Sequence, residues 1–301
     1  METLKKCPLC GAVGQADPFI HAIDHLVTRK VFSTQKCRSC KLVYTNPRPF
    51  SRNMHQYYVS DRYVSHADTP DRLLDRIYGL VRKFMAGRKI RMMRPCLTKS
   101  ATILDVGCGT GVFLHALQKK GYHVMGVEPG KKAAELAASK GIVVRGSLEE
   151  LAAESPHTFD AITLWHVLEH IADPVGQLGI CRQLLKPTGV LLVATPMCNS
   201  FDAAFYKQHW AAWDVPRHLM HFTPETLQSA LQKAGFAMLK TRMLPFDAFY
   251  ISILSEQNMQ SWPKPLALLR ALFIGMLSNI SAAASLKPAS SKVMVCQPSA
   301  H

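Results

Sequence analysis

The sequence predicts an α/β protein whose main part is a doubly wound parallel sheet, preceded by a small cysteine-rich module. Three observations lead to this prediction. Apolar runs of β type alternate with helical patterns from Ala101 onward, at the spacing of successive β-α-β units. One of these runs, Ile103–Val106, leads directly into a glycine-rich turn. The first forty residues hold two C-x-x-C pairs.

Five strands are expected in succession, with helices between them. The strands are predicted at Ala101–Val106, His123–Glu128, Ile142–Arg145, Phe159–Trp165 and Gly189–Ala194. The helices are predicted at Gly111–Lys120, Lys131–Lys140, Leu148–Ala153 and Pro174–Leu185. A further helix at Pro224–Ala234 and strands at Phe236–Met243 and Ser290–Cys296 follow, and a basic helix at Asp71–Arg94 precedes the sheet. Ligands of such a sheet bind at the carboxyl ends of its strands.

Composition and charge narrow the class of protein. An apolar content of 48% in 301 residues suits a chain with a sizeable core. The formal charge of +15 suggests a polyanion partner, but residues 1–100 carry 19 basic and 7 acidic side chains while residues 101–200 carry 8 and 9. No signal peptide or membrane-spanning run is expected, since the longest apolar candidate, Pro265–Ile280, is short and contains Arg270. These features predict a cytoplasmic protein.

The strand and turn at residues 103–111 are the strongest functional signal. Gly107 and Gly109 let the backbone turn and approach a ligand, and Gly111 lets the next helix pack near the strand. The following strand ends at Glu128, whose carboxylate can accept hydrogen bonds from both hydroxyls of a ribose. Asp105 suits the amino group of an amino acid better than a pyrophosphate. The G-C-G-T-G spacing disfavours the alternative, a nicotinamide-dependent dehydrogenase.

Four ordered stretches resemble the class I S-adenosylmethionine-dependent methyltransferases. They are L-D-V-G-C-G-T-G at 104–111, G-V-E-P at 126–129, F-D-A-I-T-L-W-H-V-L-E-H at 159–170 and L-L-K-P-T-G-V-L-L-V-A-T-P at 184–196. The resemblance implies a Rossmann-like sheet of seven strands with the last one antiparallel. It also implies a cofactor site for S-adenosylmethionine, made by these residues: Asp105, Gly107, Cys108, Gly109 and Gly111 around the methionine part, Glu128 at the ribose, Ser147 and Leu148 beside the adenine, and the backbone of Leu164 or Trp165 opposite.

The two cysteine pairs predict a zinc site. Tetrahedral zinc takes four thiolates, and each C-x-x-C turn presents two. The expected ligands are Cys7, Cys10, Cys37 and Cys40. A site closed by four cysteines is structural, and the alternative is a redox pair or unrelated thiols. The basic side chains nearby keep RNA binding open, although zinc-containing rRNA guanine methyltransferases usually complete their site with a histidine.

The candidate residues for the methyl-acceptor site follow the fourth predicted strand. His166, Glu169 and His170 are candidate bases, because methyl transfer often needs a group that takes a proton from the acceptor. The text H-V-L-E-H also resembles the E-x-x-E-H segment of ubiquinone-biosynthesis O-methyltransferases, where these side chains are implicated in metal binding. Here the first acid is replaced by His166, which puts a second metal in doubt.

Two other segments are candidates for the acceptor site. Residues 210–222 offer Asp214, Arg217, His218 and His221, either as acceptor contacts or as a loop fixed by its own ion pair. Aromatic residues upstream are expected to form a lid over the cofactor: Tyr57, Tyr58, Tyr63 and His66. We expect His166, His170, His218 and Tyr58 to be the catalytic set.

These signals combine into three parts: a zinc ribbon at 1–48, an aromatic lid and basic linker helix at 49–100, and a methyltransferase domain at 101–301 with a cap inserted at about 247–289. For the helical pattern at Pro265–Ile280 in this insertion, a dimer helix and an interfacial membrane helix are the alternatives to a cap. The expected function is methyl transfer to oxygen or carbon of a small molecule, such as a sugar nucleotide, a glycan precursor or a phenolic, lipid-like compound. The alternatives are an RNA methyltransferase that uses the basic ribbon, and a non-catalytic S-adenosylmethionine-binding protein. Nothing in the sequence indicates the oligomeric state.

Overall fold

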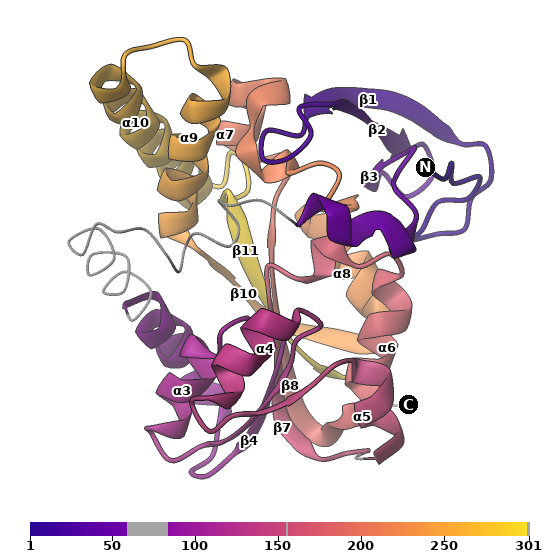
Figure 1. Ribbon diagram of the computed structural model, residues 1–301, viewed down its shortest axis with the longest axis vertical. Coiled ribbons are helices and arrows are strands. Elements are labelled where there is room, and N and C mark those ends of the chain that lie inside the picture. The colour runs from indigo at the N-terminus through magenta and orange to yellow at the C-terminus, as the bar shows by residue number, and fades with distance from the viewer. Residues whose placement is uncertain (59–83, 155, 300–301) are drawn as a thin grey trace.

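The central element of the protein is a seven-stranded sheet in the order β10-β11-β8-β7-β4-β5-β6, as seen in a computed structural model that describes residues 1–58, 84–154 and 156–299 (Figure 1). Strands β4 to β8 run parallel to one another, and β11 is antiparallel to both β8 and β10. The predicted doubly wound, seven-stranded fold with an antiparallel last strand is therefore confirmed.

The strands of this sheet are β4 (Thr102–Val106), β5 (His123–Val127), β6 (Val143–Arg145), β7 (Phe159–Trp165), β8 (Leu185–Pro196), β10 (Phe236–Met243) and β11 (Ser291–Pro298). The helices around it are α3 (Val112–Gln118), α4 (Lys131–Ala138), α5 (Leu148–Glu154), α6 (Pro174–Leu184), α7 (Phe201–Tyr206), α8 (Pro224–Lys233), α9 (Pro245–Met259) and α10 (Lys264–Ala283).

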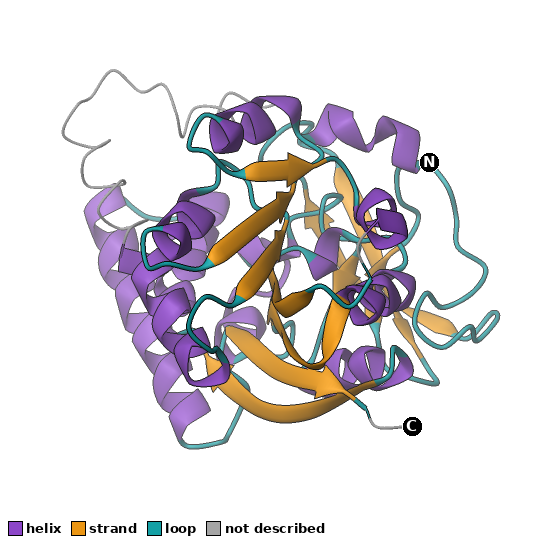
Figure 2. Ribbon diagram, turned by 90° about the horizontal axis from the view of Figure 1, so that it is seen from below, coloured by secondary structure: helices purple, strands orange, loops and turns teal. Residues whose placement is uncertain are grey.

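Both faces of the sheet are covered, which explains why its strands read as continuous apolar runs (Figure 2). Neighbouring residues of β4 enter different clusters, with Leu104 packed among residues of α5, α6 and α8. Ile103 packs instead among residues of α3 and of a helix at 84–93. The carboxyl ends of β4, β5 and β7 thus lie at one edge between two covered faces.

A second sheet, in the order β1-β2-β3-β9, holds the N-terminal region. Its strands are β1 (Ala16–Ile23), β2 (Val31–Cys37), β3 (Val43–Thr45) and β9 (Met220–His221). All of its pairs are antiparallel, and β9 joins β3 through Val43 opposite His221 and Tyr44 opposite Met220. The cysteine-rich module is therefore completed by a strand that lies far along the chain.

The predicted strands and helices of the main sheet are present, with small shifts at their ends. The helix at 84–93 is the described part of the predicted basic helix, whose residues 71–83 lie outside the described residues. Helix α9 was not predicted. Helix α10 has 20 residues and is long and apolar enough to cross a membrane by length and composition alone, a test that core helices of soluble proteins also pass.

Candidate active site

Three glycines shape the loop after β4. Gly107, Gly109 and Gly111 have φ values of 67°, 54° and 73°, in the left-handed region that favours glycine. A Cβ atom at Gly107 would lie 2.6 Å from Val167 Cγ2, and one at Gly111 would lie 2.6 Å from Ile142 Cδ1. A Cβ at Gly109 would meet no described atom within 4 Å. Two glycines therefore allow close packing, and Gly109 borders open space that a ligand can use.

Glu128 follows β5 and faces this loop. Its Oε2 accepts a hydrogen bond from the Gly109 amide at 2.9 Å, and its Oε1 accepts one from the Gly130 amide at 2.9 Å. The carboxylate is thus fixed beside the open side of Gly109. The Cys108 thiol instead occupies the space that a Cβ at Gly126 would need, and burial raises its pKa to about 12. Cys108 is a small packing residue of the loop.

Asp105 is buried near the end of β4. The Thr163 hydroxyl donates a hydrogen bond of 2.5 Å to its Oδ1. Burial raises the pKa of Asp105 to about 6, although the ammonium of Lys89 and the bond from Thr163 oppose the rise. Lys89 Nζ lies 4.7 Å from the ring centre of Trp165. Sequence reasoning missed Lys89, since a lysine in a basic helix has no local motif that ties it to the glycine loop.

Ser147 and Leu148 follow β6 at the same edge of the sheet as Glu128. Ser147 Oγ accepts a hydrogen bond of 3.3 Å from the Glu150 amide, and Leu148 is buried at the first turn of α5. The serine therefore caps a helix, which is a structural role. Their contact with adenine stays a prediction.

The four cysteines of the N-terminal module come together. All four sulfur atoms lie within 4.8 Å of one another, with 3.5 Å between Cys7 and Cys40 and 3.7 Å between Cys10 and Cys37. Zinc–sulfur bonds of about 2.3 Å in a tetrahedron place the sulfur atoms roughly 3.8 Å apart. The donor set and its spacing therefore fit a zinc ion in a closed four-thiolate site, the type that has a structural role in proteins.

His166, the first residue after β7, has a φ of 58° and lies between two carboxylates. Its Nε2 is 3.0 Å from Asp247 Oδ2, without the alignment of a hydrogen bond, and its Nδ1 is 3.4 Å from Glu169 Oε1. Burial favours the neutral ring, but the two carboxylates outweigh it and raise the pKa of His166 to about 10. A ring that is already protonated cannot take a proton, so this geometry suits an orienting cation better than a base.

A second group of rings brings His170, His218 and Tyr58 together. The ring centres of the two histidines are 4.6 Å apart, and Tyr58 Oη lies 3.1 Å from His170 Nδ1. His170 Nδ1 is also 3.1 Å from the Arg217 carbonyl oxygen, and His218 Nδ1 is 2.8 Å from that of Ala212. A carbonyl oxygen only accepts, so each Nδ1 that bonds to it carries a hydrogen. In a neutral His170 ring, Nε2 therefore keeps its lone pair. Burial and the neighbouring His218 lower the pKa of His170 to about 4.

Glu169 lies beneath these rings with both carboxylate oxygens buried and, among the described residues, without a hydrogen-bond donor. One ligand atom from each of Glu169, His170 and His218 falls within 4.8 Å of the others. A carboxylate and two imidazoles oriented by backbone carbonyls are a donor set that divalent cations accept. His218 thus supplies a third ligand atom, whereas the E-x-x-E-H pattern has an acid at the position of His166.

Arg217 fastens the N-terminal sheet to this cluster. Its guanidinium is buried, lies 3.0 Å from Asp24 and 2.7 Å from Asp214, and donates to the Tyr57 carbonyl at 3.0 Å. The Thr45 hydroxyl bonds the His218 carbonyl at 2.8 Å and lies 3.0 Å from His221 Nε2. Asp214, Arg217 and His221 therefore serve mainly to fix the loop, and the loop in turn presents His218.

The sequence profile of a family described as a methyltransferase domain matches residues 71–241, which is more than half of the 301 residues. The chain belongs to this methyltransferase family. A ubiquinone biosynthesis O-methyltransferase of Xanthomonas campestris pv. campestris is 32% identical over 173 residues, covering 53% of this chain and 68% of that protein. The protein of the same name from Nitrosospira multiformis is 37% identical over 100 residues, covering 31% of this chain and 42% of that protein.

Solved structures share the fold of this methyltransferase at lower identity. A SAM dependent methyltransferase from Archaeoglobus fulgidus has a TM-score of 0.50 and 19% identity, over 72% of this chain and 94% of that one. The cyclase SpnF has a TM-score of 0.51 and 17% identity, over 73% and 81%. These similarities concern the fold alone. Family membership and the named relatives support S-adenosylmethionine-dependent methyl transfer, and the four-cysteine module precedes the matched residues.

The structure describes only part of the predicted lid, but it describes the whole segment that was predicted as a cap. Tyr63 and His66 lie outside the described residues, whereas Tyr58 reaches His170. The segment predicted as a cap forms the pair α9 and α10, of which α9 brings Asp247 to His166. The sequence does not predict a role for Asp247 of this methyltransferase, because only the tertiary structure brings it close to the end of β7.

Proposed function

We propose that this methyltransferase moves the S-adenosylmethionine methyl group to an oxygen of a small-molecule acceptor, either a phenolic, lipid-like compound or a sugar-containing precursor; transfer to carbon is the variant of the same reaction. The observation that carries the proposal is the group Tyr58, His170 and His218, in which His170 offers a neutral imidazole nitrogen next to the end of β7. The printed names of relatives, O-methyltransferases of ubiquinone biosynthesis, support an oxygen acceptor.

The reaction needs a nucleophilic oxygen aligned with the methyl group and a place for its proton. S-adenosylmethionine supplies an activated methyl on a sulfonium, whose C–S electron pair leaves with sulfur as the new C–O bond forms. His170 is the residue suited to receive the acceptor proton at Nε2, because its lowered pKa leaves it neutral at physiological pH. His166, as a cation between Asp247 and Glu169, holds those carboxylates in place.

Two metal ions fit the chain's donor sets. Zinc in the four-cysteine cluster would stabilise the N-terminal sheet that contains Thr45. A divalent cation on Glu169, His170 and His218 would lower the pKa of an acceptor hydroxyl bound to it.

RNA methylation remains the alternative. The N-terminal sheet uses β3 to pair with β9 and its buried Asp24 to bind Arg217, so part of its surface is committed to the acceptor region. A module held in this way is suited to enclosing a small acceptor.

The test measures transfer of a labelled methyl group from S-adenosylmethionine to three kinds of acceptor: simple phenols, sugar nucleotides and total RNA. We expect transfer to a small-molecule hydroxyl, and a loss of roughly 100-fold or more in turnover for His170→Gln, with binding of S-adenosylhomocysteine unchanged. His157→Gln, a change of the same kind far from the cluster, is the matched control.

Each outcome assigns the reaction. Methylation of RNA alone would refute the small-molecule proposal. Full turnover by His170→Gln would remove His170 as the proton acceptor. A metal ion other than zinc, present in equal amount to the chain and lost in His218→Ala, would assign activation of the acceptor to the cation rather than to the imidazole.

A further inference from the structure

Helix α10 presents most of its large apolar side chains outward and mainly small and polar ones inward. Its exposed large apolar residues are Leu266, Leu268, Leu269, Leu272, Phe273, Met276 and Ile280. Its buried residues are Ala271, Ile274, Gly275, Ser278 and Ser281. This is the reverse of the arrangement in a surface helix of a soluble domain, where the apolar stripe faces the core.

Polar contacts hold the inner face in place. Arg270 Nε lies 2.7 Å from Glu256 Oε1, and Ser278 Oγ donates a bond of 2.7 Å to Asp202 Oδ1. A Cβ at Gly275 would lie 2.7 Å from a ring carbon of α9, so the two helices are in close contact. The orientation of α10 is therefore fixed by specific contacts, and the outward direction of its apolar side chains follows from them.

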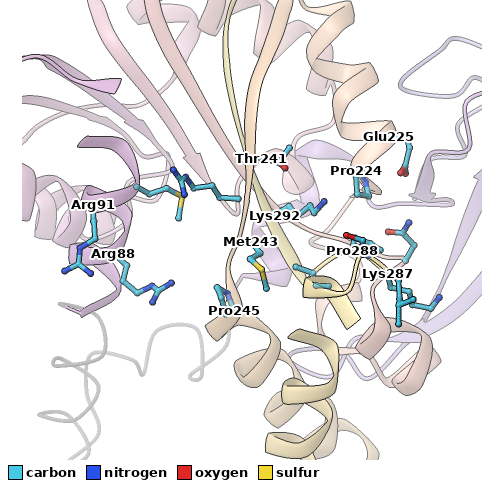
Figure 3. A pocket seen from close by; sticks show the side chains of 17 residues that line it. Arg88, Arg91, Pro224, Glu225, Thr241, Met243, Pro245, Lys287, Pro288 and Lys292 are labelled. Carbon is cyan, nitrogen blue, oxygen red and sulfur yellow. The ribbon is translucent and has the colours of Figure 1, made fainter. Parts of the chain in front are cut away.

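A cationic hollow lies at the carboxyl end of α10. Its volume is about 1100 Å³, and it is lined by residues of the helix at 84–93, of β10 and of the segment that links α10 to β11. Its charged residues are Arg88, Arg91, Arg242, Lys287, Lys292 and a single acid, Glu225. Figure 3 shows Arg88 and Arg91 on one side, Lys287 on the other and Lys292 between them. Within the described part of the chain, none of the five cations forms an ion pair.

The connections of α10 decide how it can meet a membrane. The pair α9 and α10 begins at the end of β10 and returns to β11, so both of its ends are tied to the same sheet (Figure 1). Twenty residues at 1.5 Å each extend about 30 Å along the surface. A helix held in this way can lie in the plane of a bilayer surface but cannot cross the bilayer without leaving the domain.

We propose that the outer face of α10 lies in the surface layer of a bilayer that contains anionic phospholipids, with the cations of the hollow facing the headgroups. An apolar helix face buries its side chains at the acyl boundary, and nearby lysine and arginine side chains add attraction to anionic lipids. Trp262 is exposed and Lys264 begins the helix, so an aromatic ring and a cation also flank its amino end. This interaction is separate from methyl transfer and does not depend on the identity of the acceptor.

The charge of the chain favours a bilayer over a second copy as the partner. A formal charge of +15 on each copy opposes self-association, and it attracts an anionic surface. The contact would also place α9, which carries Asp247 at the acceptor site, next to the lipid.

The test is flotation of the full chain with vesicles. One set contains equal parts phosphatidylglycerol and phosphatidylcholine, and the other contains phosphatidylcholine alone. We expect binding to the anionic vesicles that weakens as salt rises, and a loss of roughly ten-fold or more in Leu269→Glu/Phe273→Glu. Leu136→Glu/Val143→Glu, which places the same two charges on exposed apolar residues of α4 and β6, is the matched control and should bind as the unaltered chain does.

S-adenosylhomocysteine binding by each variant verifies that the main sheet is folded. No binding to either vesicle overturns the proposal. Equal binding to both vesicles overturns the role of the hollow. A dimer in solution that Leu269→Glu/Phe273→Glu separates, without vesicle binding by the unaltered chain, would assign the face to a second copy.

Discussion

The proposed cofactor side and the proposed acceptor side of the site are built in different ways. The cofactor side consists of one loop and one strand end that lie close together in the sequence, Gly107 to Gly111 and Glu128, and its hydrogen bonds run between backbone amides and one carboxylate. The acceptor side joins Tyr58, His170 and Arg217 through contacts that span 47 to 160 residues of the chain.

Because they are built differently, the two sides should also differ in how they respond to damage elsewhere in the protein. The cofactor loop depends on glycines and on the parallel sheet. The acceptor cluster depends on a small module that carries four cysteines and on one buried arginine. Damage to the module should therefore remove the acceptor side first and leave cofactor binding in place.

Removal of zinc should have the largest effect. We expect one zinc ion per chain and its loss in Cys37→Ser, because three thiolates cannot close the site. The ion contributes on the order of 10 kcal/mol to small modules of this type, so the N-terminal sheet should unfold and turnover should cease. Metal analysis and protease digestion measure both effects.

The control for this experiment is Cys96→Ser, which alters a half-buried cysteine outside the cluster. S-adenosylhomocysteine should bind to both variants. If purified, unaltered protein contains no zinc, the module is held by its thiols and their packing alone.

The sequence predicts the cofactor loop better than it predicts the acceptor cluster. Glycines at 107, 109 and 111 act through local backbone geometry, so their spacing already indicated the loop and its ligand class. Lys89, Asp247 and Thr45 have no local pattern, and only the packing of distant elements brings them to the site. His166 is one of three candidate bases by sequence, and only the tertiary structure shows the two carboxylates beside its ring.

The sequence also does not predict which face of helix α10 points toward the protein core. The apolar residues of α10 fit a helical pattern, which favours a packed helix. The deciding facts are tertiary: Ser278 bonds Asp202 and Arg270 bonds Glu256, and these bonds turn the leucines outward.

After zinc removal, loss of the buried ion pairs of Arg217 should have the next largest effect on stability. Arg217→Ala leaves Asp24 and Asp214 without their buried cation, which typically costs about 3–5 kcal/mol. Urea unfolding followed by circular dichroism measures the loss. The matched control is Arg38→Ala, which breaks an exposed arginine–aspartate pair and should change stability little. Equal losses in both variants would show that burial does not set the strength of the Arg217 contacts.

A substitution at Glu128 tests the proposed cofactor side. Glu128→Ala removes the acceptor of the Gly109 and Gly130 amides and the predicted ribose contact. We expect a loss of roughly 100-fold in S-adenosylhomocysteine affinity, about 2.7 kcal/mol, measured by titration calorimetry. Glu149→Ala, a change of an exposed glutamate on α5, is the control. Unaltered affinity in Glu128→Ala would move the ribose contact elsewhere.

The smallest effect concerns the pH dependence of cofactor binding. Burial raises the pKa of Asp105 to about 6 in the free protein, and the predicted contact with the cofactor's amino group, a cation, favours the ionised form. Binding therefore lowers this pKa, so affinity is complete above pH 6 and falls as the pH drops below it, by at most about ten-fold per pH unit. In Asp105→Asn the affinity should be lower throughout and flat from about pH 7 to pH 5. A flat profile in the unaltered protein would mean that Asp105 stays neutral beside the cofactor, and that the amino group is held by the loop's carbonyl groups instead.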